Sequence, residues 1–117
     1  MTGRATNHGH HLLSDGSFLI FNNSPRDGGD NSNVLEFDLV QTESSMTASL
    51  VKDYEGTTLS GVLGDVQRLP GGNTLITYSD ASQIAEVDAD WQIVQTFSGS
   101  VGYAEWRATL YGPPARL

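Results

Sequence analysis

The amino-acid sequence contains two copies of one unit, and this internal repeat constrains the fold more than any other feature. Residues 13–20 read Leu-Ser-Asp-Gly-Ser-Phe-Leu-Ile and align with residues 69–76, Leu-Pro-Gly-Gly-Asn-Thr-Leu-Ile, at an offset of 69 − 13 = 56. Residues 34–38 align with residues 84–88 at an offset of 84 − 34 = 50, so the first copy has about six additional residues around 24–33. Repeats of this length are typical of architectures in which one supersecondary unit packs against the next.

The hydrophobic pattern within each copy predicts β-strands and no helix. No window of roughly ten residues keeps apolar residues at helical spacing without an interruption by Gly, Pro, Asn or Asp. Apolar stretches bounded by turn residues, such as those at 15–16 and 71–73, instead indicate strands. The predicted strands are His8–Leu13, Phe18–Asn23, Val34–Leu39, Ala48–Tyr54, Val62–Leu69, Thr74–Ser79, Gln83–Asp88, Trp91–Phe97 and Tyr103–Leu110.

Four strands per copy, joined by short turns, correspond to one blade of a β-propeller. We therefore predict an all-β fold of two four-stranded antiparallel blades, residues 1–61 with the Gly- and Asp-rich insertion and residues 62–117 with a closing strand at 102–111. Closed propellers have about four to eight blades, so two blades need further copies of the chain. A cyclic homotrimer would have six blades and leave no sheet edge open, whereas a dimer would have four. The alternative is a monomeric sandwich of two sheets.

Charge and composition exclude several classes of function. Six Lys and Arg residues stand against 14 Asp and Glu residues, and the net charge of −8 argues against nucleic acid or an anionic membrane as partner. The chain has no cysteine, which excludes disulfides, zinc–thiolate sites and thiol catalysis, and we expect no cofactor. Residues 1–11 lack the apolar core of a signal peptide, and no apolar run reaches the roughly 20 residues needed to span a bilayer. The cell compartment stays open.

Several segments, in the right order, resemble the bacterial arylsulfotransferase-like β-propellers. Residues 64–76, Gly-Asp-Val-Gln-Arg-Leu-Pro-Gly-Gly-Asn-Thr-Leu-Ile, resemble the blade signature G-x-V-Q-R-L-P-N-G-N-T-L-I of that family. Residues 8–16 resemble its Q-H-D-x-x-x-L-P-N-G stretch, and residues 21–23 resemble the F-D-N that follows. Residues 34–37 resemble its S-x-x-L-E-F/Y strand, and residues 103–107 resemble its terminal Y-R-A-x-R segment. The match covers nearly the whole chain and corresponds to roughly the C-terminal third of a full-length member.

The resemblance implies a six-bladed fold with an axial active site, where a histidine accepts a sulfuryl group from an aryl sulfate and passes it to a phenol. It implies that His8 is this histidine, that His10 is a second polar site residue, and that Arg26 binds sulfate. Imidazole is a competent nucleophile near neutral pH, and a planar guanidinium group suits a sulfate anion. Arg107, in the closing strand, either stacks on an aromatic ring or lines the axis and binds substrate. The family also implies a periplasmic or secreted location.

The histidines also have simpler interpretations. His8, His10 and His11 form a cluster that is either solvated or binds metal non-specifically. Because side chains two apart on a strand share a face, we expect His8 and His10 to point the same way. A specific zinc or copper site would need a third ligand, and none stands at a matching spacing. The position equivalent to His8 in the second copy, 8 + 56 = 64, is Gly64, so the repeat supplies one histidine site per chain.

The charged residues that recur in the repeat are expected to be structural. Arg68 is expected to pair with a carboxylate between the blades, and the repeated Glu36 and Glu86 hold the same place in both copies. Two alternatives to an enzyme follow from the single histidine site. One is a non-enzymatic module whose ring binds a small anion or a metal, and the other is a propeller fragment that only self-assembles.

Overall fold

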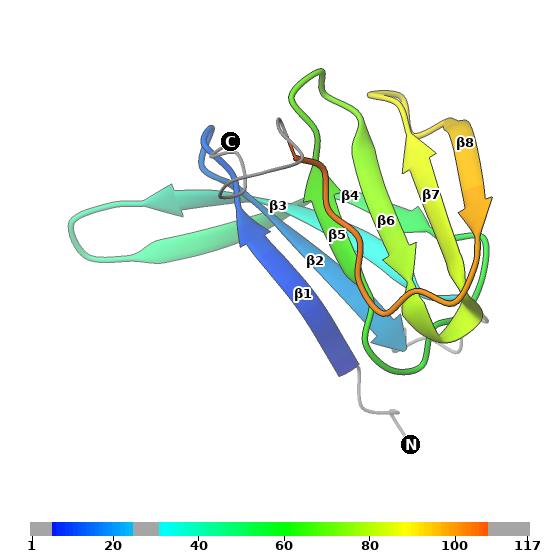
Figure 1. Cartoon of the computed structure of the whole chain (residues 1–117). Helices are drawn as coiled ribbons and strands as arrows, with labels where there is room; N and C mark the ends of the chain where they lie inside the picture. Colours follow the sequence, from blue (N-terminus) through cyan, green and yellow to red (C-terminus); the bar gives the residue numbers. More distant parts are fainter. Residues whose placement is uncertain (1–5, 25–30, 108–117) are drawn as a thin grey trace.

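The structure, a computed structural model, describes residues 6–24 and 31–107, and this part of the chain forms eight strands and one short 3-10 helix (Figure 1). The prediction of an all-β fold is therefore confirmed. The elements in chain order are β1 (Thr6–Leu12), β2 (Ser17–Ser24), β3 (Asn33–Gln41), β4 (Met46–Glu55), β5 (Asp65–Arg68), β6 (Thr74–Tyr78), η1 (Ser79–Ala81), β7 (Gln83–Val87) and β8 (Ile93–Ser98).

The strands form two four-stranded antiparallel sheets, each a meander in chain order. The first sheet has the order β1-β2-β3-β4 and the second the order β5-β6-β7-β8. The first turn of each sheet is the same: the amide of Gly16 donates to the carbonyl of Leu13, and the amide of Gly72 to that of Leu69, both at 3.0 Å. Both glycines have positive φ angles, +89° and +96°, which other residues adopt only at a cost. The repeat seen in the sequence thus extends to turn geometry.

The third and fourth strands carry the same irregularity in both sheets. The pairing of β3 with β4 shifts register between Glu36 and Phe37, and the pairing of β7 with β8 shifts between Glu86 and Val87. These positions correspond at the repeat offset of 86 − 36 = 50. A β-bulge at one position of both copies indicates that the two sheets are versions of a single structural unit.

Two of the predicted strands differ in the structure. The strand predicted at 62–69 is reduced to Asp65–Arg68, because Leu63 and Gly64 have φ angles of +55° and +93°, which end the extended backbone. The closing strand predicted at 102–111 forms no strand over residues 102–107, and its last residues lie outside the described part of the chain.

The two sheets stack face to face around one hydrophobic core. In each sheet we name the face toward the other sheet the inner face, and the opposite one the outer face. The rings of Phe21 and Tyr78 meet edge to face across the interface, with their centroids 5.8 Å apart. The core side chains, none more than 1% exposed, are Leu19, Phe21 and Val34 of the first sheet and Val66, Ile76, Tyr78, Ala85 and Val87 of the second. Full burial of a large apolar side chain stabilises a fold by about 1.5–3 kcal/mol.

Buried hydrogen bonds fix the linker between the sheets, residues 56–64, to the end of the first sheet. The side-chain amide of Asn23 donates to the carbonyl oxygens of Ser60 and Leu63, and the hydroxyl of Ser32 donates to the carbonyl of Asn23. Asn23, Ser32 and Ser60 are at most 2% exposed. Because a buried polar group left unpaired costs about 1–3 kcal/mol, these contacts fix the course of the linker and hence the position of β5.

The two inner faces are opposite faces of the repeat. Leu19, on the inner face of the first sheet, aligns with Leu75, but the buried residue of the second sheet is the neighbour, Ile76. The third strands differ in the same way. Val34 is buried in β3 and aligns with position 84, but the buried residue of β7 is the next one, Ala85. Because successive side chains of a strand point to opposite faces, the contact between the sheets is head to tail and not two-fold.

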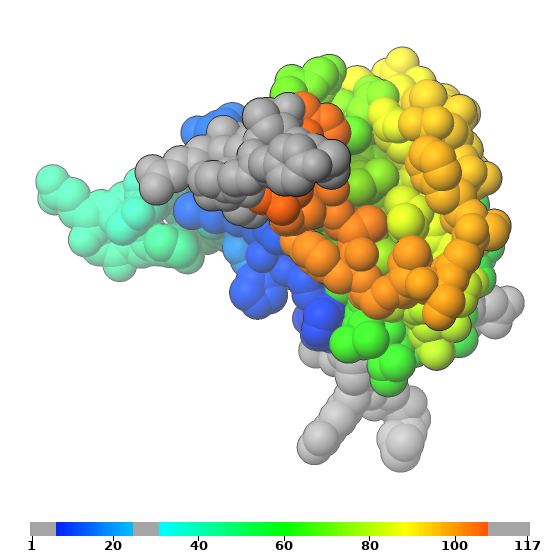
Figure 2. Space-filling model, in the orientation of Figure 1, coloured from blue at the N-terminus to red at the C-terminus, as the bar shows by residue number. Residues whose placement is uncertain are grey.

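The residues after β8 return over the second sheet. Residues 99–107, which we name the strap, cross its outer face and run beside β5 (Figures 1 and 2). The backbone amide of Trp106 donates to the side-chain carbonyl of Gln67 at 2.8 Å, and the hydroxyl of Ser79 donates to the carbonyl of Gly102 at 2.6 Å. The amide of Gly99 also donates to the carbonyl of Ser82 at 2.9 Å, and residues 99–107 form no strand pairing with the sheet.

Candidate functional site

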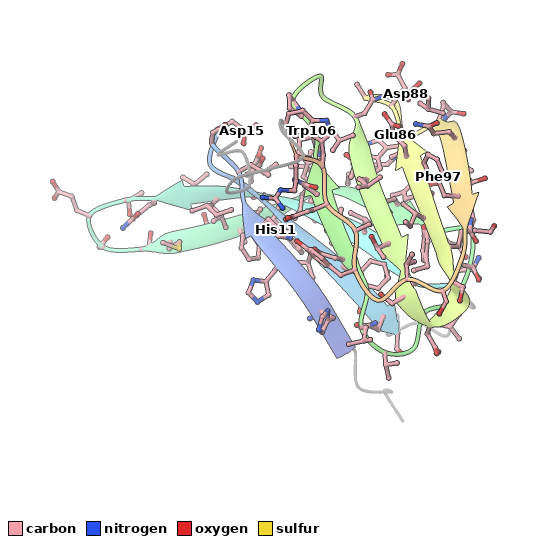
Figure 3. The ribbon with its side chains drawn as sticks, in the orientation of Figure 1. His11, Asp15, Glu86, Asp88, Phe97 and Trp106 are labelled. Carbon is pink, nitrogen blue, oxygen red and sulfur yellow. The ribbon has the colours of Figure 1, made fainter. Side chains whose placement is uncertain are left out.

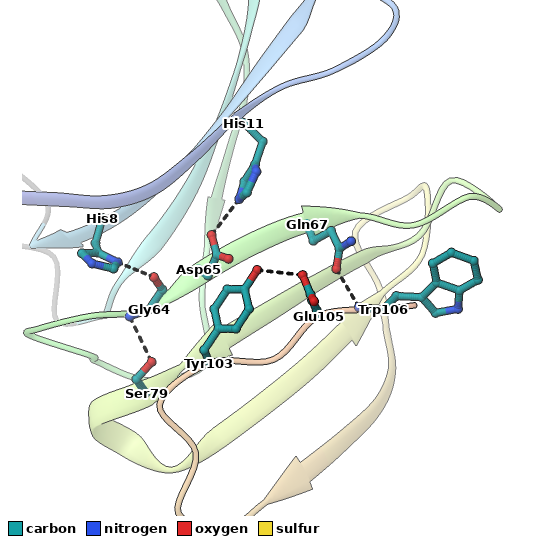
Figure 4. A network of polar contacts seen from close by, with 9 residues as sticks. All are labelled: His8, His11, Gly64, Asp65, Gln67, Ser79, Tyr103, Glu105 and Trp106. Carbon is teal, nitrogen blue, oxygen red and sulfur yellow. Dashed lines mark hydrogen bonds and ion pairs between the residues drawn. The ribbon is translucent and has the colours of Figure 1, made fainter. Parts of the chain in front are cut away.

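The first strands of the two sheets, β1 and β5, lie side by side, and polar side chains meet between them (Figure 4). Gly9 of β1 has a φ angle of +65° and lies directly against Asp65 of β5. A Cβ atom at Gly9 would overlap the carboxylate oxygen and the Cα atom of Asp65. A glycine is therefore required here both for its backbone conformation and for the close approach of the two strands.

Gly9 also forms a bulge in β1. His8 pairs with Phe21 of β2, and His10 pairs with Ile20, so two residues that are two apart in β1 face two adjacent residues in β2. The inserted glycine changes the alternation of side chains, because a bulge adds one residue to one strand only. His8 and His10 therefore lie on opposite faces of the first sheet.

The prediction that His8 and His10 point the same way is wrong for this reason. The ring of His10 lies on the outer face and stacks on Phe18, with centroids 5.8 Å apart and an interplanar angle of 27°. His11 pairs with Leu19 and so shares the inner face with His8. The two histidines that face the second sheet are His8 and His11, and a metal site built from His8 and His10 on one face does not form.

His8 reaches the start of β5 through its ring. Its Nδ1 atom lies 2.7 Å from the carbonyl oxygen of Gly64, and the amide of Gly64 donates to the hydroxyl of Ser79 at 3.0 Å. A carbonyl oxygen only accepts, so Nδ1 carries the proton, and Nε2 of the neutral ring keeps its lone pair. The side chain of His8 is exposed. The arrangement therefore presents an imidazole of fixed tautomer to solvent.

His11 and Asp65 form an ion pair between the sheets. The Nε2 atom of His11 lies 2.8 Å from the Oδ1 atom of Asp65, and the side chains are 39% and 9% exposed. The hydrogen bond to Asp65 raises the pKa of His11, although partial burial opposes this shift. The pair joins β1 to β5 three residues beyond His8 in the strand, and it favours a protonated His11.

A groove of about 790 Å³ opens between the turn after β1, the turn after β5 and the strap. Figure 3 labels a residue from three of its sides: His11 on β1, Asp15 in the first turn and Trp106 in the strap. Arg68 and Glu105 also line it. Among the described lining residues, two carboxylates thus stand against one guanidinium group and one histidine, and two aromatic rings of the strap, at positions 103 and 106, add apolar surface.

The arginines considered in the sequence analysis differ in how the structure places them. Arg26 lies outside the described residues, and Arg107 is an exposed residue at the end of the strap. Arg68 donates to Oε2 of Glu36 at 2.8 Å, and its guanidinium carbon lies 5.8 Å from the centroid of the Trp91 ring. The prediction that Arg68 pairs with a carboxylate of the other repeat is confirmed. Its charge is thereby already engaged in the contact between the sheets.

The second repeated glutamate makes contacts within its own sheet. Glu86 accepts hydrogen bonds from the side-chain amides of Asn73 and Gln95, at 2.8 Å and 2.6 Å. These bonds lower the pKa of Glu86, because they stabilise its charged form. Glu86 is thus held in its charged form within its sheet, and Glu36 accepts a hydrogen bond from Arg68, so both contacts agree with the structural role expected from the repeat.

Sequence reasoning did not single out Gly9 or Asp65, and it did not place His11 on the same face of the strand as His8. A glycine within an alternating strand is a known signal of a bulge, and Gly9 stands between two histidines. The pairing of His11 with Asp65 has no local signal, because the two residues are 54 positions apart and meet only when the sheets stack.

Among residues 6–24 and 31–107, no three His, Cys, Asp or Glu side chains gather in a way that could hold a metal ion. Over the same residues, no helix has the length and apolar character needed to cross a membrane. The polar contacts between β1 and β5, with the adjoining groove, form the candidate site.

Comparisons with known proteins leave the family open. No family model matches the chain, and neither a curated protein nor a solved structure matches it. The resemblance to the arylsulfotransferase-like propellers rests on the residues quoted above and stays a prediction.

Proposed function

We propose that the chain is a two-blade unit of an arylsulfotransferase-like propeller that joins further copies in a ring, preferably a six-bladed homotrimer, and transfers sulfuryl groups from aryl sulfates to phenols through His8. One observation supports this proposal most. His8 donates its Nδ1 proton to the carbonyl of Gly64 at 2.7 Å, which leaves Nε2 with a lone pair on an exposed ring.

The proposed reaction has two steps that balance at one sulfur atom. The lone pair of His8 Nε2 attacks the sulfur of the aryl sulfate, an N–S bond forms, the S–O(aryl) bond breaks, and the aryloxide leaves and takes a proton from water. The sulfated ring is positively charged, and the carbonyl of Gly64 stabilises that charge through the Nδ1 proton. The phenol oxygen of the acceptor then attacks the same sulfur and restores the neutral histidine, while the phenol proton passes to water.

Binding of the sulfate group would require cationic donors, because the chain has a net charge of −8. We propose that Arg26 and Arg107 supply them, since Arg68 is engaged with Glu36. In a ring, each copy would add one His8 and these two arginines around the axis. The ring would also enclose a site that in one chain is open to solvent.

The test is turnover of 4-nitrophenyl sulfate with phenol as acceptor, followed as release of 4-nitrophenolate. His8→Ala should lower the rate by at least about 100-fold, because the nucleophile is lost. His10→Ala is the matched control, because it removes a histidine of the same strand on the opposite face. With a native mass equal to that of the wild type by sedimentation velocity, its rate should stay within about twofold of the wild type, because surface substitutions rarely disturb a fold. Equal rates for His8→Ala and the wild type, or no turnover by the wild type, would exclude the catalytic role.

A second candidate is a non-enzymatic propeller unit that binds a small anion or only self-assembles. The acidic lining of the groove favours the form that only self-assembles, because Asp15 and Glu105 repel an aryl sulfate or a sulfate anion. A ligand that binds only the folded chain raises its thermal stability, so sulfate titration followed by thermal unfolding distinguishes the two forms of this candidate. A rise in melting temperature with sulfate indicates anion binding, and no change leaves self-assembly.

A further inference from the structure

We propose that copies of this chain stack head to tail, with the outer face of the first sheet of one copy packed on the outer face of the second sheet of the next. This inference rests on the ring in the proposed function and names the surfaces that would form it. It does not depend on the sulfuryl chemistry. The partner is a second copy of the same chain, and the argument comes from the contact that the two sheets already make within one chain.

The internal contact is a template for a contact between copies. It joins one face of the repeat unit in the first sheet to the opposite face of the unit in the second sheet, as shown by the burial of Leu19 in β2 but of Ile76, not Leu75, in β6. Each chain therefore leaves one face of each kind without a second unit stacked on it. A head-to-tail contact of this kind repeats from copy to copy until it closes into a ring.

The outer face of the first sheet has the composition of a buried face. Leu12 and Leu50 lie on this face, and they are 67% and 54% exposed. Its central positions are apolar and only half-buried. In the repeat they align with core residues on the inner face of the second sheet: Ile20 with Ile76, Leu35 with Ala85 and Phe37 with Val87. A solvated sheet face normally alternates to polar residues, so this face is suited to a covering layer.

The outer face of the second sheet presents the complementary positions. Register places Phe97 opposite Ile84 as it places Tyr54 opposite Val34. Tyr54 stacks on the ring of Trp91 across the internal contact, with centroids 5.2 Å apart. Phe97 is 51% exposed and lies at the equivalent place, on β8 (Figure 3). We expect Phe97 to contact the first sheet of the next copy, as Trp91 and Tyr54 contact one another within the chain.

The strap holds the place that one strand of the next copy would take. Within the chain, β5 packs over β1 and β2 of the first sheet, and the strap runs over the second sheet beside β5 in a similar way (Figures 1 and 2). It is fastened there by the hydrogen bonds from Trp106 to Gln67 and from Ser79 to Gly102. Docking of a second copy therefore requires the strap to leave β5, and loosening the strap should strengthen association.

The test uses one charged substitution on each outer face. Leu50→Asp changes the first sheet, Phe97→Asp changes the second, and both replace side chains that are about half exposed, 54% and 51%. Leu59→Asp, in the linker and outside both outer faces, is the matched control, because Leu59 is 48% exposed. Native mass is measured by sedimentation velocity over a range of protein concentrations, and circular dichroism checks that each variant is folded. Leu50→Ser and Phe97→Ser replace any aspartate variant that fails to fold.

A head-to-tail contact predicts a specific pattern. The wild type and Leu59→Asp should exceed the chain mass of 12.6 kDa as concentration rises, and each outer-face variant alone should stay at that mass. A mixture of Leu50→Asp and Phe97→Asp should form pairs and nothing larger, because one intact face of each kind remains. Added salt should strengthen association of the wild type, since copies with a net charge of −8 repel one another. Gln67→Ala, which removes an anchor of the strap, should strengthen it further.

Three results would overturn the inference. Association of Phe97→Asp alone would indicate a two-fold contact through the first sheet, and a mixture that stays monomeric would exclude the paired faces. A monomeric wild type, together with a monomeric Gln67→Ala, would exclude stacking altogether. The aryl sulfate assay keeps the two proposals separate. If copies stack but turnover does not depend on His8, only the proposed chemistry is refuted. If turnover depends on His8 but copies do not stack, only the inference drawn from these faces is refuted.

Discussion

Substitution of Gly64 by alanine tests the close packing that positions the carbonyl partner of His8. Gly64 has a φ angle of +93°, and a Cβ atom there would overlap the ring of Phe21, which is fully buried. Gly72 has nearly the same φ angle, +96°, but open space where its Cβ would lie. Gly64→Ala and Gly72→Ala therefore share the backbone cost and differ in the steric one.

The two costs can be estimated separately. An alanine in the left-handed region costs about 1–2 kcal/mol, and forcing an extra carbon into a packed core costs about 1–3 kcal/mol. We expect Gly72→Ala to lower the free energy of unfolding by the first amount and Gly64→Ala by about 2–5 kcal/mol, the combined amount. Urea unfolding followed by tryptophan fluorescence measures both. A difference below about 0.5 kcal/mol between the variants would show that Phe21 moves aside and would refute the packing argument.

Two further predictions concern charged contacts between the sheets. In a double-mutant cycle, Arg68→Met and Glu36→Gln should couple by about 1–2 kcal/mol, because the side chains are 26% and 16% exposed, whereas Arg68→Met and Glu86→Gln should be additive. Because Asp65 raises the pKa of His11 above 6.5, the pair stabilises the fold fully below pH 6.5, and this contribution is lost as the pH rises through the raised value. The unfolding free energies of the wild type and His11→Gln should therefore differ by at most about 1 kcal/mol at about pH 5, since the ring is 39% exposed. The two free energies should converge as the pH rises above 6.5 and through the raised pKa, and a gap independent of pH would contradict this.

The repeat in the sequence predicted the features that depend on neighbouring residues. The aligned segments 13–20 and 69–76 form the same turn, and the alternation in the following residues gives β2 and β6 close to the predicted bounds. The insertion around 24–33 falls between β2 and β3, as the two offsets require. One contact between distant residues was also predicted in kind, the pairing of Arg68 with a carboxylate of the other repeat, because a cation on a strand that packs against another sheet needs a carboxylate near it.

Other features that depend on distant residues were not predicted. The bulge at Gly9 forms where Asp65 packs against the backbone of β1, and no local pattern in β1 indicates that approach. Without the bulge, regular alternation would place His8 on the same face as His10. With the bulge, His8 lies on the same face as His11. The segment at 103–107 alternates like a strand but has no strand pairing in the described chain. A strand pattern alone does not supply the neighbour that a strand requires.

The geometry of His8 separates the proposed chemistry from the proposed ring. The hydrogen bond from His8 to Gly64 lies within one chain, so a monomer already holds the imidazole in the tautomer that leaves Nε2 free. Enclosure of the imidazole from water would come only from neighbouring copies, because His8 is exposed in the single chain.

A folded monomeric variant such as Leu50→Asp should therefore keep the nucleophile and lose the enclosure. Hydrolysis of the sulfated histidine by water should then compete with transfer to phenol, and the ratio of sulfate released to phenyl sulfate formed should rise relative to the wild type. An unchanged ratio in the monomer would mean that acceptor selection is complete within one chain.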